Sequence, residues 1–268
     1  MNSSQMRNAA AIPVVVTIGG IDPGAGAGLG RDLLTASALG AAVRMVGTAW
    51  TEQSEQGVWS IEPRAATAFA DAVRRALRAP GPAVVKIGMV TGPSQAEAIL
   101  RGLGDFDGPV VVDPVLWASH GGALWNGSPA EMGPLLRRAT LVTPNVPEAV
   151  ALTGQAILNV SDMARAAAAL QAAGVSAVLV KGGHLGAGSA APVTDLLATA
   201  QGQRRYERPR VHQDGPGPRG TGCALATAIA VALAHGDALE TAIERATGWL
   251  AERIARSADI DGQRRLGA

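Results

Sequence analysis

Short apolar runs alternate with longer helical patterns along almost the whole chain, and this alternation constrains the fold more than any other feature of the sequence. Runs such as residues 12–18 and 110–112 are largely apolar at odd and even positions alike. This is typical of strands that are buried on both faces, which occur in parallel sheets covered by helices. The sequence therefore predicts an α/β fold with a mostly parallel sheet.

The same patterns predict the order of the elements. The predicted strands are residues 12–18, 42–48, 83–87, 110–112, 141–143 and 177–181, followed by an antiparallel pair, 193–197 and 204–208. The predicted helices are residues 27–39, 63–77, 93–100, 129–138, 146–152, 161–173, 221–234 and 238–257. No Pro-, Ser- or charge-rich linker interrupts this order, so we expect one domain over residues 12–268 after a disordered tail, residues 1–11.

The composition argues against several classes of partner. The formal net charge is +1, which gives no electrostatic reason to expect nucleic acid or an anionic membrane as a partner. The single cysteine cannot form an internal disulfide, so a cytoplasmic location is expected. The polar N-terminus lacks the apolar segment of a signal peptide, and no apolar stretch reads as a membrane span.

The motif Arg219-Gly220-Thr221-Gly222-Cys223 leads directly into an Ala-rich helix. Glycines let the backbone approach a ligand, and the unpaired amides of a helix start favour an anion. The thiol stands at the same helix start, where its pKa is expected to be lowered. An anion cradle with a candidate base predicts phosphoryl transfer.

Three side chains near predicted strand ends are candidates for contact with a small ligand. Asp32 follows a Gly-rich loop that is either a flexible turn or a loop packed on the ligand, with the carboxylate pointing at it. Gln53 offers a donor and an acceptor to a heteroaromatic ring edge, unless it is a surface residue. Met89 can pack on a flat ring or belong to the core.

Four polar residues follow later strands. Asp113 either holds a metal-bound water or caps a loop, and Lys181 can reach nucleotide phosphates. Asn145 and Glu148 have the spacing of a helix capping box. The alternative places Glu148 near Mg²⁺, which takes few carboxylates together with phosphate oxygens and water.

The order of six motifs resembles that of the ribokinase-like superfamily, and within it the hydroxymethylpyrimidine and phosphomethylpyrimidine kinases of thiamine biosynthesis. The motifs are Gly-Gly-x-Asp-Pro from residue 19, Lys-Ile-Gly-Met from 86, Val-Asp-Pro-Val from 112, Thr-Pro-Asn-x-Pro-Glu-Ala from 143, Lys-Gly-Gly-His from 181 and Gly-Thr-Gly-Cys from 220. The resemblance covers residues 12–256 and implies a three-layer α/β/α sandwich, ATP, Mg²⁺ and a homodimer.

The resemblance also implies roles for the candidate residues. The pyrimidine is expected against Gly20, Asp32, Gln53, Met89 and Val115. ATP is expected near Asn145, Lys181, Arg219 and Thr221, the metal near Asp113 and Glu148, and the substrate hydroxymethyl group near Cys223, with Gly220, Thr221 and Gly222 completing the catalytic cradle.

Two departures from the family pattern stand out. Arg219 replaces a histidine, and it is expected to bind phosphate or to lower the Cys223 pKa. Arg264 or Arg265 stands in for a C-terminal lysine that is thought to help hold a phosphorylated substrate, which leaves phosphorylation of the monophosphate open. The alternatives are a pyridoxal-type kinase, or a catalytically weak pyrimidine-binding regulator of the same fold.

Overall fold

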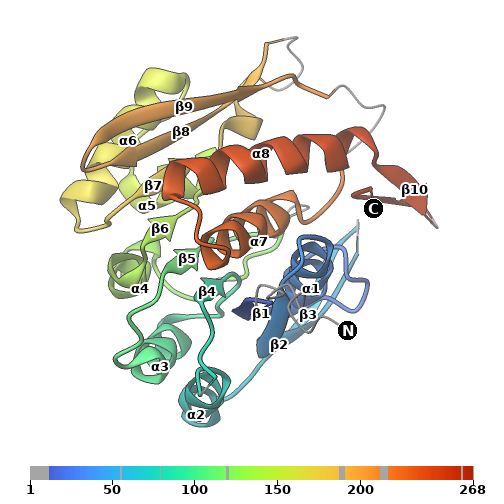
Figure 1. Ribbon diagram of the computed structural model, residues 1–268, viewed down its shortest axis with the longest axis vertical. Coiled ribbons are helices and arrows are strands. Elements are labelled where there is room, and N and C mark those ends of the chain that lie inside the picture. The colour runs from blue at the N-terminus through green and yellow to red at the C-terminus, as the bar shows by residue number, and fades with distance from the viewer. Residues whose placement is uncertain are drawn as a thin grey trace, which may run out of the picture.

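Nine strands form one sheet in the order β3-β2-β1-β4-β5-β6-β7-β8-β9 (Figure 1). Neighbours from β2 to β7 run parallel, whereas β3, β8 and β9 join antiparallel at the two edges. The computed structural model describes residues 12–54, 56–78, 80–118, 121–186, 191–211, 217–260 and 262–267. The predicted tail, residues 1–11, lies outside these ranges.

The elements of the sheet and its helices alternate as the sequence predicts. The strands are β1 (Val14–Ile21), β2 (Ala42–Ser54), β3 (Gly57–Pro63), β4 (Val84–Ile87), β5 (Val110–Val112), β6 (Leu141–Val142), β7 (Val178–Val180), β8 (Val193–Thr199) and β9 (Gly202–Arg208). The helices are α1 (Gly28–Ala38), α2 (Ala66–Ala76), α3 (Pro93–Leu103), α4 (Gly133–Arg138), α5 (Val146–Thr153), α6 (Val160–Ala172), α7 (Thr221–Ala234) and α8 (Leu239–Ala255). Short 3₁₀ turns cover Pro129–Met132 and Gly182–His184.

Two apolar cores lie on opposite faces of the sheet, because successive strand residues point to opposite sides. Val16 and Ile18 of β1 pack into the core beneath α2 to α6, while Val15 packs into the core beneath α1, α7 and α8. The two helix layers are visible in Figure 1. The observed architecture is thus the expected α/β/α sandwich, with the sheet in the middle.

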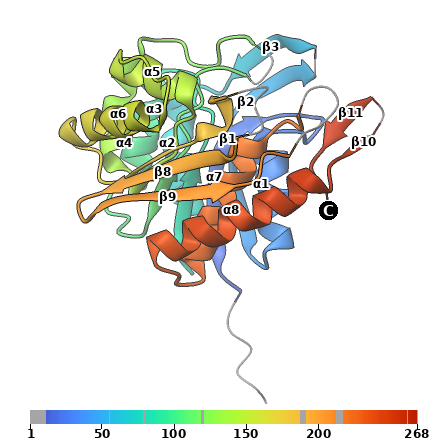
Figure 2. The same ribbon diagram turned by 90° about the horizontal axis from the view of Figure 1, so that it is seen from above.

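A short hairpin, β10 (Ala258–Ile260) with β11 (Gln263–Arg265), follows α8 (Figure 2). The sequence patterns did not predict it, because its strands are short and exposed or half-buried. They also missed β3, and the helix predicted from residue 63 begins instead at Ala66. Pro63 belongs to β3, where it pairs with Ala49.

The strand β2 is likewise longer than the strand predicted over residues 42–48. Residues 42–47 and Trp50 pair with β1, and residues 49–54 pair with β3. This antiparallel extension carries Gln53 on a strand, where we expected a loop past the strand end.

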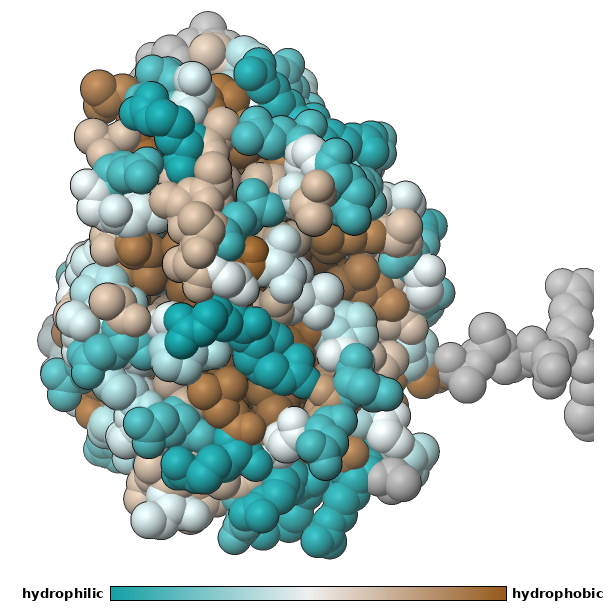
Figure 3. Space-filling view, turned by 90° about the vertical axis from the view of Figure 1, so that its left-hand side faces the viewer, coloured by the Kyte–Doolittle hydropathy of each residue, from teal (hydrophilic) through white to brown (hydrophobic). Residues whose placement is uncertain are grey.

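The outer surface mixes polar and apolar residues. In the space-filling view, hydrophobic side chains form several separate areas among hydrophilic ones (Figure 3). Among the helices of the described ranges, none is both long and apolar enough to cross a membrane.

Candidate active site

The candidate residues meet in one cavity of about 850 Å³ beside the carboxyl ends of the parallel strands. Its lining includes every residue predicted to act in catalysis or to bind the ring, ATP or the metal, but neither Arg264 nor Arg265. The residues included are Gly20, Asp32, Gln53, Met89, Asp113, Val115, Asn145, Glu148, Lys181, Arg219, Gly220, Thr221, Gly222 and Cys223. The topology therefore brings them together, and the role of each stays a prediction.

The start of α7 forms a cradle of glycines. Gly220 has φ +72°, and a Cβ at this position would lie 2.2 Å from the Gly26 carbonyl oxygen, so a larger residue does not fit. A Cβ on Gly222 would lie 3.1 Å from Lys181 Nζ and 3.4 Å from Asp113 Oδ2. Because neither glycine carries a side chain, the first amides of α7 are accessible beside the Lys181 ammonium group. Backbone amides next to a positive charge form a suitable site for a phosphate.

Cys223 lies on the first turn of α7, and its sulfur accepts a hydrogen bond from the Gly28 amide. The expected lowering of its pKa is wrong. Burial raises the pKa of the Cys223 thiol, and the charges of Asp32 and Asp113 add to this, while Lys86 pulls in the opposite direction. The side chain is therefore a neutral thiol at neutral pH, not a preformed thiolate.

Asp113 and Lys181 form an ion pair at the mouth of the cradle. Lys181 Nζ lies 2.6 Å from Asp113 Oδ1, which also accepts a bond from the Thr143 hydroxyl at 3.2 Å. Burial alone would lower the pKa of Lys181, but Asp113 and Glu148 raise it, so the ammonium stays charged. A fixed positive charge thus faces the site expected for phosphate.

Asn145 and Glu148 form the capping box that was one of the two alternatives. Asn145 Oδ1 accepts from the Glu148 amide at 2.8 Å, and Glu148 Oε2 accepts from the Asn145 amide at 2.7 Å. Burial raises the pKa of Glu148 to about 7, opposed by Lys181 and assisted by Asp113. The cap does not exclude the metal role, since it uses one carboxylate oxygen.

A second ion pair lies deeper in the cavity. Lys86 Nζ contacts both carboxylate oxygens of Asp32, at 2.8 and 2.9 Å, and the Thr227 hydroxyl donates to the same carboxylate at 2.7 Å. Burial would lower the pKa of Lys86, but the charges of Asp32, Cys223 and Asp113 and the hydrogen bond to Asp32 together raise it. The carboxylate is thus held within the protein while it lines the cavity, and its expected contact with a ligand stays a prediction.

Sequence reasoning gave no role to Lys86, although it lines the cavity and is 1 % exposed. The available signal was a lysine within the otherwise apolar strand Val84–Ile87. A buried lysine requires an acidic partner, but the strand pattern did not indicate which one.

One wall of the cavity is apolar. Met89, Ala49 and Leu124 form a small buried cluster against which Val115 packs. A Cβ on Gly20 would lie 2.5 Å from the Met89 sulfur, so the glycine keeps this wall flat. A slot with one flat apolar wall suits a planar ring.

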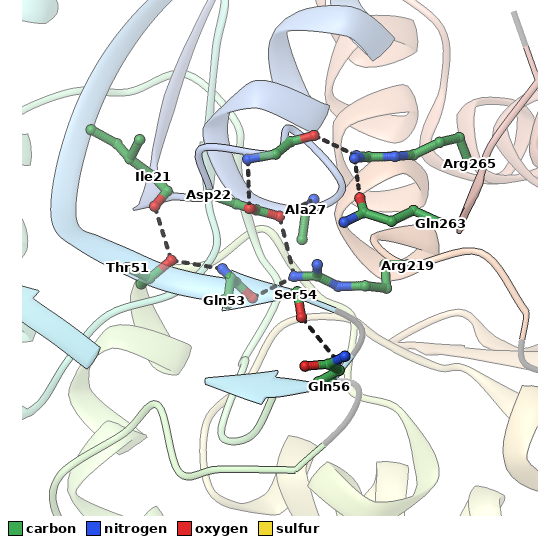
Figure 4. A network of polar contacts seen from close by, with 11 residues as sticks. Ile21, Asp22, Ala27, Thr51, Gln53, Ser54, Gln56, Arg219, Gln263 and Arg265 are labelled. Atoms are coloured by element: carbon green, nitrogen blue, oxygen red, sulfur yellow. Dashed lines mark hydrogen bonds and ion pairs between the residues drawn. The ribbon is translucent and has the colours of Figure 1, made fainter. Parts of the chain in front are cut away.

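Arg219 joins the Gly-rich loop after β1 to the distal half of β2 (Figure 4). It donates to Gln53 Oε1 at 2.5 Å and to Asp22 Oδ2 at 3.2 Å. The net shift of the Cys223 pKa is upward because the thiol is buried, and the expected influence of Arg219 on it stays a prediction. Arg265 donates to the Gly24 carbonyl of the same loop, whereas Arg264 contacts the Ser257 hydroxyl.

The chain is similar to known proteins over most of its length. A family model described as phosphomethylpyrimidine kinase matches residues 22–266. The chain belongs to the phosphomethylpyrimidine kinase family. This membership confirms the resemblance and makes the protein a kinase of the ribokinase-like fold.

Individual relatives agree with the family assignment. A hydroxymethylpyrimidine/phosphomethylpyrimidine kinase of Streptomyces coelicolor is 37% identical over 255 residues, 93% of this chain and 91% of the relative. The crystal structure of phosphomethylpyrimidine kinase from Clostridium difficile 630 has a TM-score of 0.76 at 31% identity, covering 90% of this kinase and 98% of that chain. Pyridoxal kinase from Staphylococcus aureus in complex with AMP-PCP has a TM-score of 0.84 at 27% identity, covering 96% and 93%.

Proposed function

We propose that this kinase transfers the γ-phosphoryl group of ATP to the hydroxymethyl group of 4-amino-5-hydroxymethyl-2-methylpyrimidine. The observation that carries the proposal is that one cavity contains both the site expected for the ring and the site expected for the phosphate. A flat apolar wall and the Gln53 amide suit an aminopyrimidine, and the same cavity contains the glycine cradle of α7 and the Cys223 thiol. The names of the curated relatives support this substrate class.

The chain's own residues suit the transfer step. The bond from the hydroxymethyl oxygen to the γ-phosphorus forms while the bond from that phosphorus to the leaving ADP oxygen breaks. Lys181 and the α7 amides stabilise the charge of the transferring group. Cys223, as a neutral thiol, orients the substrate hydroxyl by hydrogen bonding. The proton of that hydroxyl passes to an oxygen of the transferred phosphoryl group and leaves with the product.

Mg²⁺ fits the donor set at the cradle. Asp113 Oδ2 is turned toward Gly222. In the described part of the chain, the hydrogen bonds that the Asp113 carboxylate accepts go to Oδ1. Asp113 and Glu148 would hold the ion with phosphate oxygens and water, as Mg²⁺ prefers. When bound, the ion would neutralise charge on the phosphates.

The experiment is an ADP-release assay with purified protein, Mg-ATP and each candidate alcohol. We expect turnover with the aminopyrimidine alcohol. Turnover on pyridoxal alone would overturn the substrate assignment in favour of a pyridoxal kinase. Binding of the pyrimidine without turnover of any alcohol would instead identify a weakly catalytic binding protein.

The same assay with the pyrimidine monophosphate tests the second phosphorylation. Arg265 of β11, which donates to the Gly24 carbonyl in the loop that carries Asp22, is the proposed contact for the monophosphate. The homodimer is also a proposal and rests on the family resemblance; light scattering of the purified protein tests it. The cytoplasmic location is a proposal that rests on the single cysteine.

A further inference from the structure

The amide of Gln53 is held from two sides (Figure 4). Its Nε2 donates to the Thr51 hydroxyl oxygen at 2.8 Å, and its Oε1 accepts from Arg219 at 2.5 Å. The Thr51 hydroxyl in turn donates its proton to the Ile21 carbonyl at 2.9 Å. The contacts form one chain from Arg219 to the backbone of β1.

This chain permits one orientation of the amide. Since the Thr51 proton is committed to a carbonyl, its oxygen can only accept, and it requires the amide nitrogen beside it. Arg219 can only donate, and it requires the amide oxygen. An amide flip would place donor against donor and acceptor against acceptor, so both contacts oppose it.

Arg219 is itself fixed in place. Its residue is 7 % exposed, and its guanidinium pairs with Asp22, whose carboxylate accepts from the Gly24 amide at 3.0 Å and the Ala27 amide at 2.9 Å. Arg219 directly precedes Gly220 and is therefore next in the chain to the glycine cradle of α7. The donor that reaches Gln53 is therefore preorganised by a buried ion pair.

One N–H of Gln53 remains for a ligand. Within the described ranges Nε2 has Thr51 as its acceptor, and Gln53 lines the cavity. A charged donor on the amide oxygen polarises the amide, which strengthens the remaining N–H as a donor and weakens the oxygen as an acceptor. The cavity thus presents a fixed, strengthened donor to the ring edge.

We propose that Arg219 is a positioning residue that sets ring specificity through Gln53. It selects heteroaromatic alcohols that carry an unprotonated ring nitrogen at the edge facing this amide. The inference rests on the proposed function for the substrate class, but it concerns recognition of the ring and not transfer of the phosphoryl group.

Calorimetric binding without ATP tests the inference separately from turnover. The two probes are the aminopyrimidine alcohol and its analogue with C–H in place of the ring nitrogen beside the amino group. We expect the wild type to prefer the pyrimidine by about tenfold, which is the scale of one hydrogen bond to a buried donor. Arg219→Met should reduce this preference to about threefold or less, because the amide loses its polarising donor and one of the two contacts that fix its orientation.

Two further variants separate positioning from folding. Arg219→Lys keeps a donor and the charge beside Asp22, so it should retain a clear part of the preference. Gln53→Glu keeps an acceptor for Arg219 but removes the N–H, so it should lose the preference completely. Arg204→Gln, on the exposed face of β9, is the matched control and should match the wild type.

The outcomes distinguish the two proposals. An equal loss of affinity for both probes in Arg219→Met, with an unchanged ratio, would overturn the inference and leave Arg219 a structural role. Tight binding with the expected ratios but no turnover would overturn the kinase substrate and support the inference. Failure of the wild type to bind either probe would overturn both.

Discussion

Lys181 Nζ and Asp113 Oδ1 lie 2.6 Å apart, although 68 positions separate them in the sequence. Both residues follow parallel strands, β7 and β5, whose carboxyl ends meet at the same edge of the sheet. The pair places a fixed cation and a carboxylate against the glycine cradle of α7.

Lys181→Met should reduce kcat/KM by about a hundredfold or more, since it removes a positive charge from the phosphate site. It should also lower the free energy of unfolding by about 3 kcal/mol, because Asp113 is left buried without its cation. Steady-state kinetics and urea unfolding measure the two effects. A kcat/KM within threefold of the wild type would remove Lys181 from the phosphate site.

Lys86→Met should be the more destabilising change, by about 3–5 kcal/mol, because Asp32 is fully buried. The double variant Lys86→Met with Asp32→Asn should recover part of the loss, since no uncompensated charge remains. Arg204→Gln breaks an exposed pair with Glu244 and should cost less than about 1 kcal/mol. Equal losses in the buried and the exposed variants, measured by urea unfolding, would contradict this account.

Gly220→Ala should destabilise the protein and abolish turnover. The alanine must adopt a positive φ, which costs about 1–2 kcal/mol, and its Cβ would collide with the Gly26 carbonyl. Gly248→Ala is the matched control, because it lies in α8 with open space around it and should stabilise by about 0.5–1 kcal/mol. Thermal unfolding of both variants should show opposite shifts.

Iodoacetamide alkylation reports the protonation of Cys223, since it is the only cysteine of the chain. A raised pKa means that a smaller fraction is thiolate at any given pH than in a free cysteine. Alkylation should therefore be slower than that of a cysteine in a short peptide from about pH 7 to about pH 9, and its midpoint should lie at higher pH. A midpoint below that of the peptide would restore the thiolate as a candidate base.

The sequence predicted the elements whose signals are local. The bounds of α7 agree with the prediction for residues 221–234, since a glycine and an apolar run mark its start. The strand-end positions of Asp113 and Lys181 followed from the alternation of strands and helices. Their convergence in one cavity is a consequence of parallel topology.

The side-chain pairs could not be predicted in the same way. Lys86 meets Asp32 across 54 positions, and Arg219 meets Gln53 across 166 positions. Nothing in a local pattern identifies such partners, because they depend on how helices and loops pack on the finished sheet. The raised pKa of Cys223 escaped prediction for the same reason, as burial outweighs the helix start.

The long strand β2 has a mechanical consequence. Its first half pairs with β1, whereas from Thr51 onward it pairs with β3 alone. Gln53 lies in this second part, which is held in the sheet through β3. On the proposed role of Gln53, substitutions in β3 are therefore expected to change which ring the kinase accepts, although β3 is remote from the two large cores.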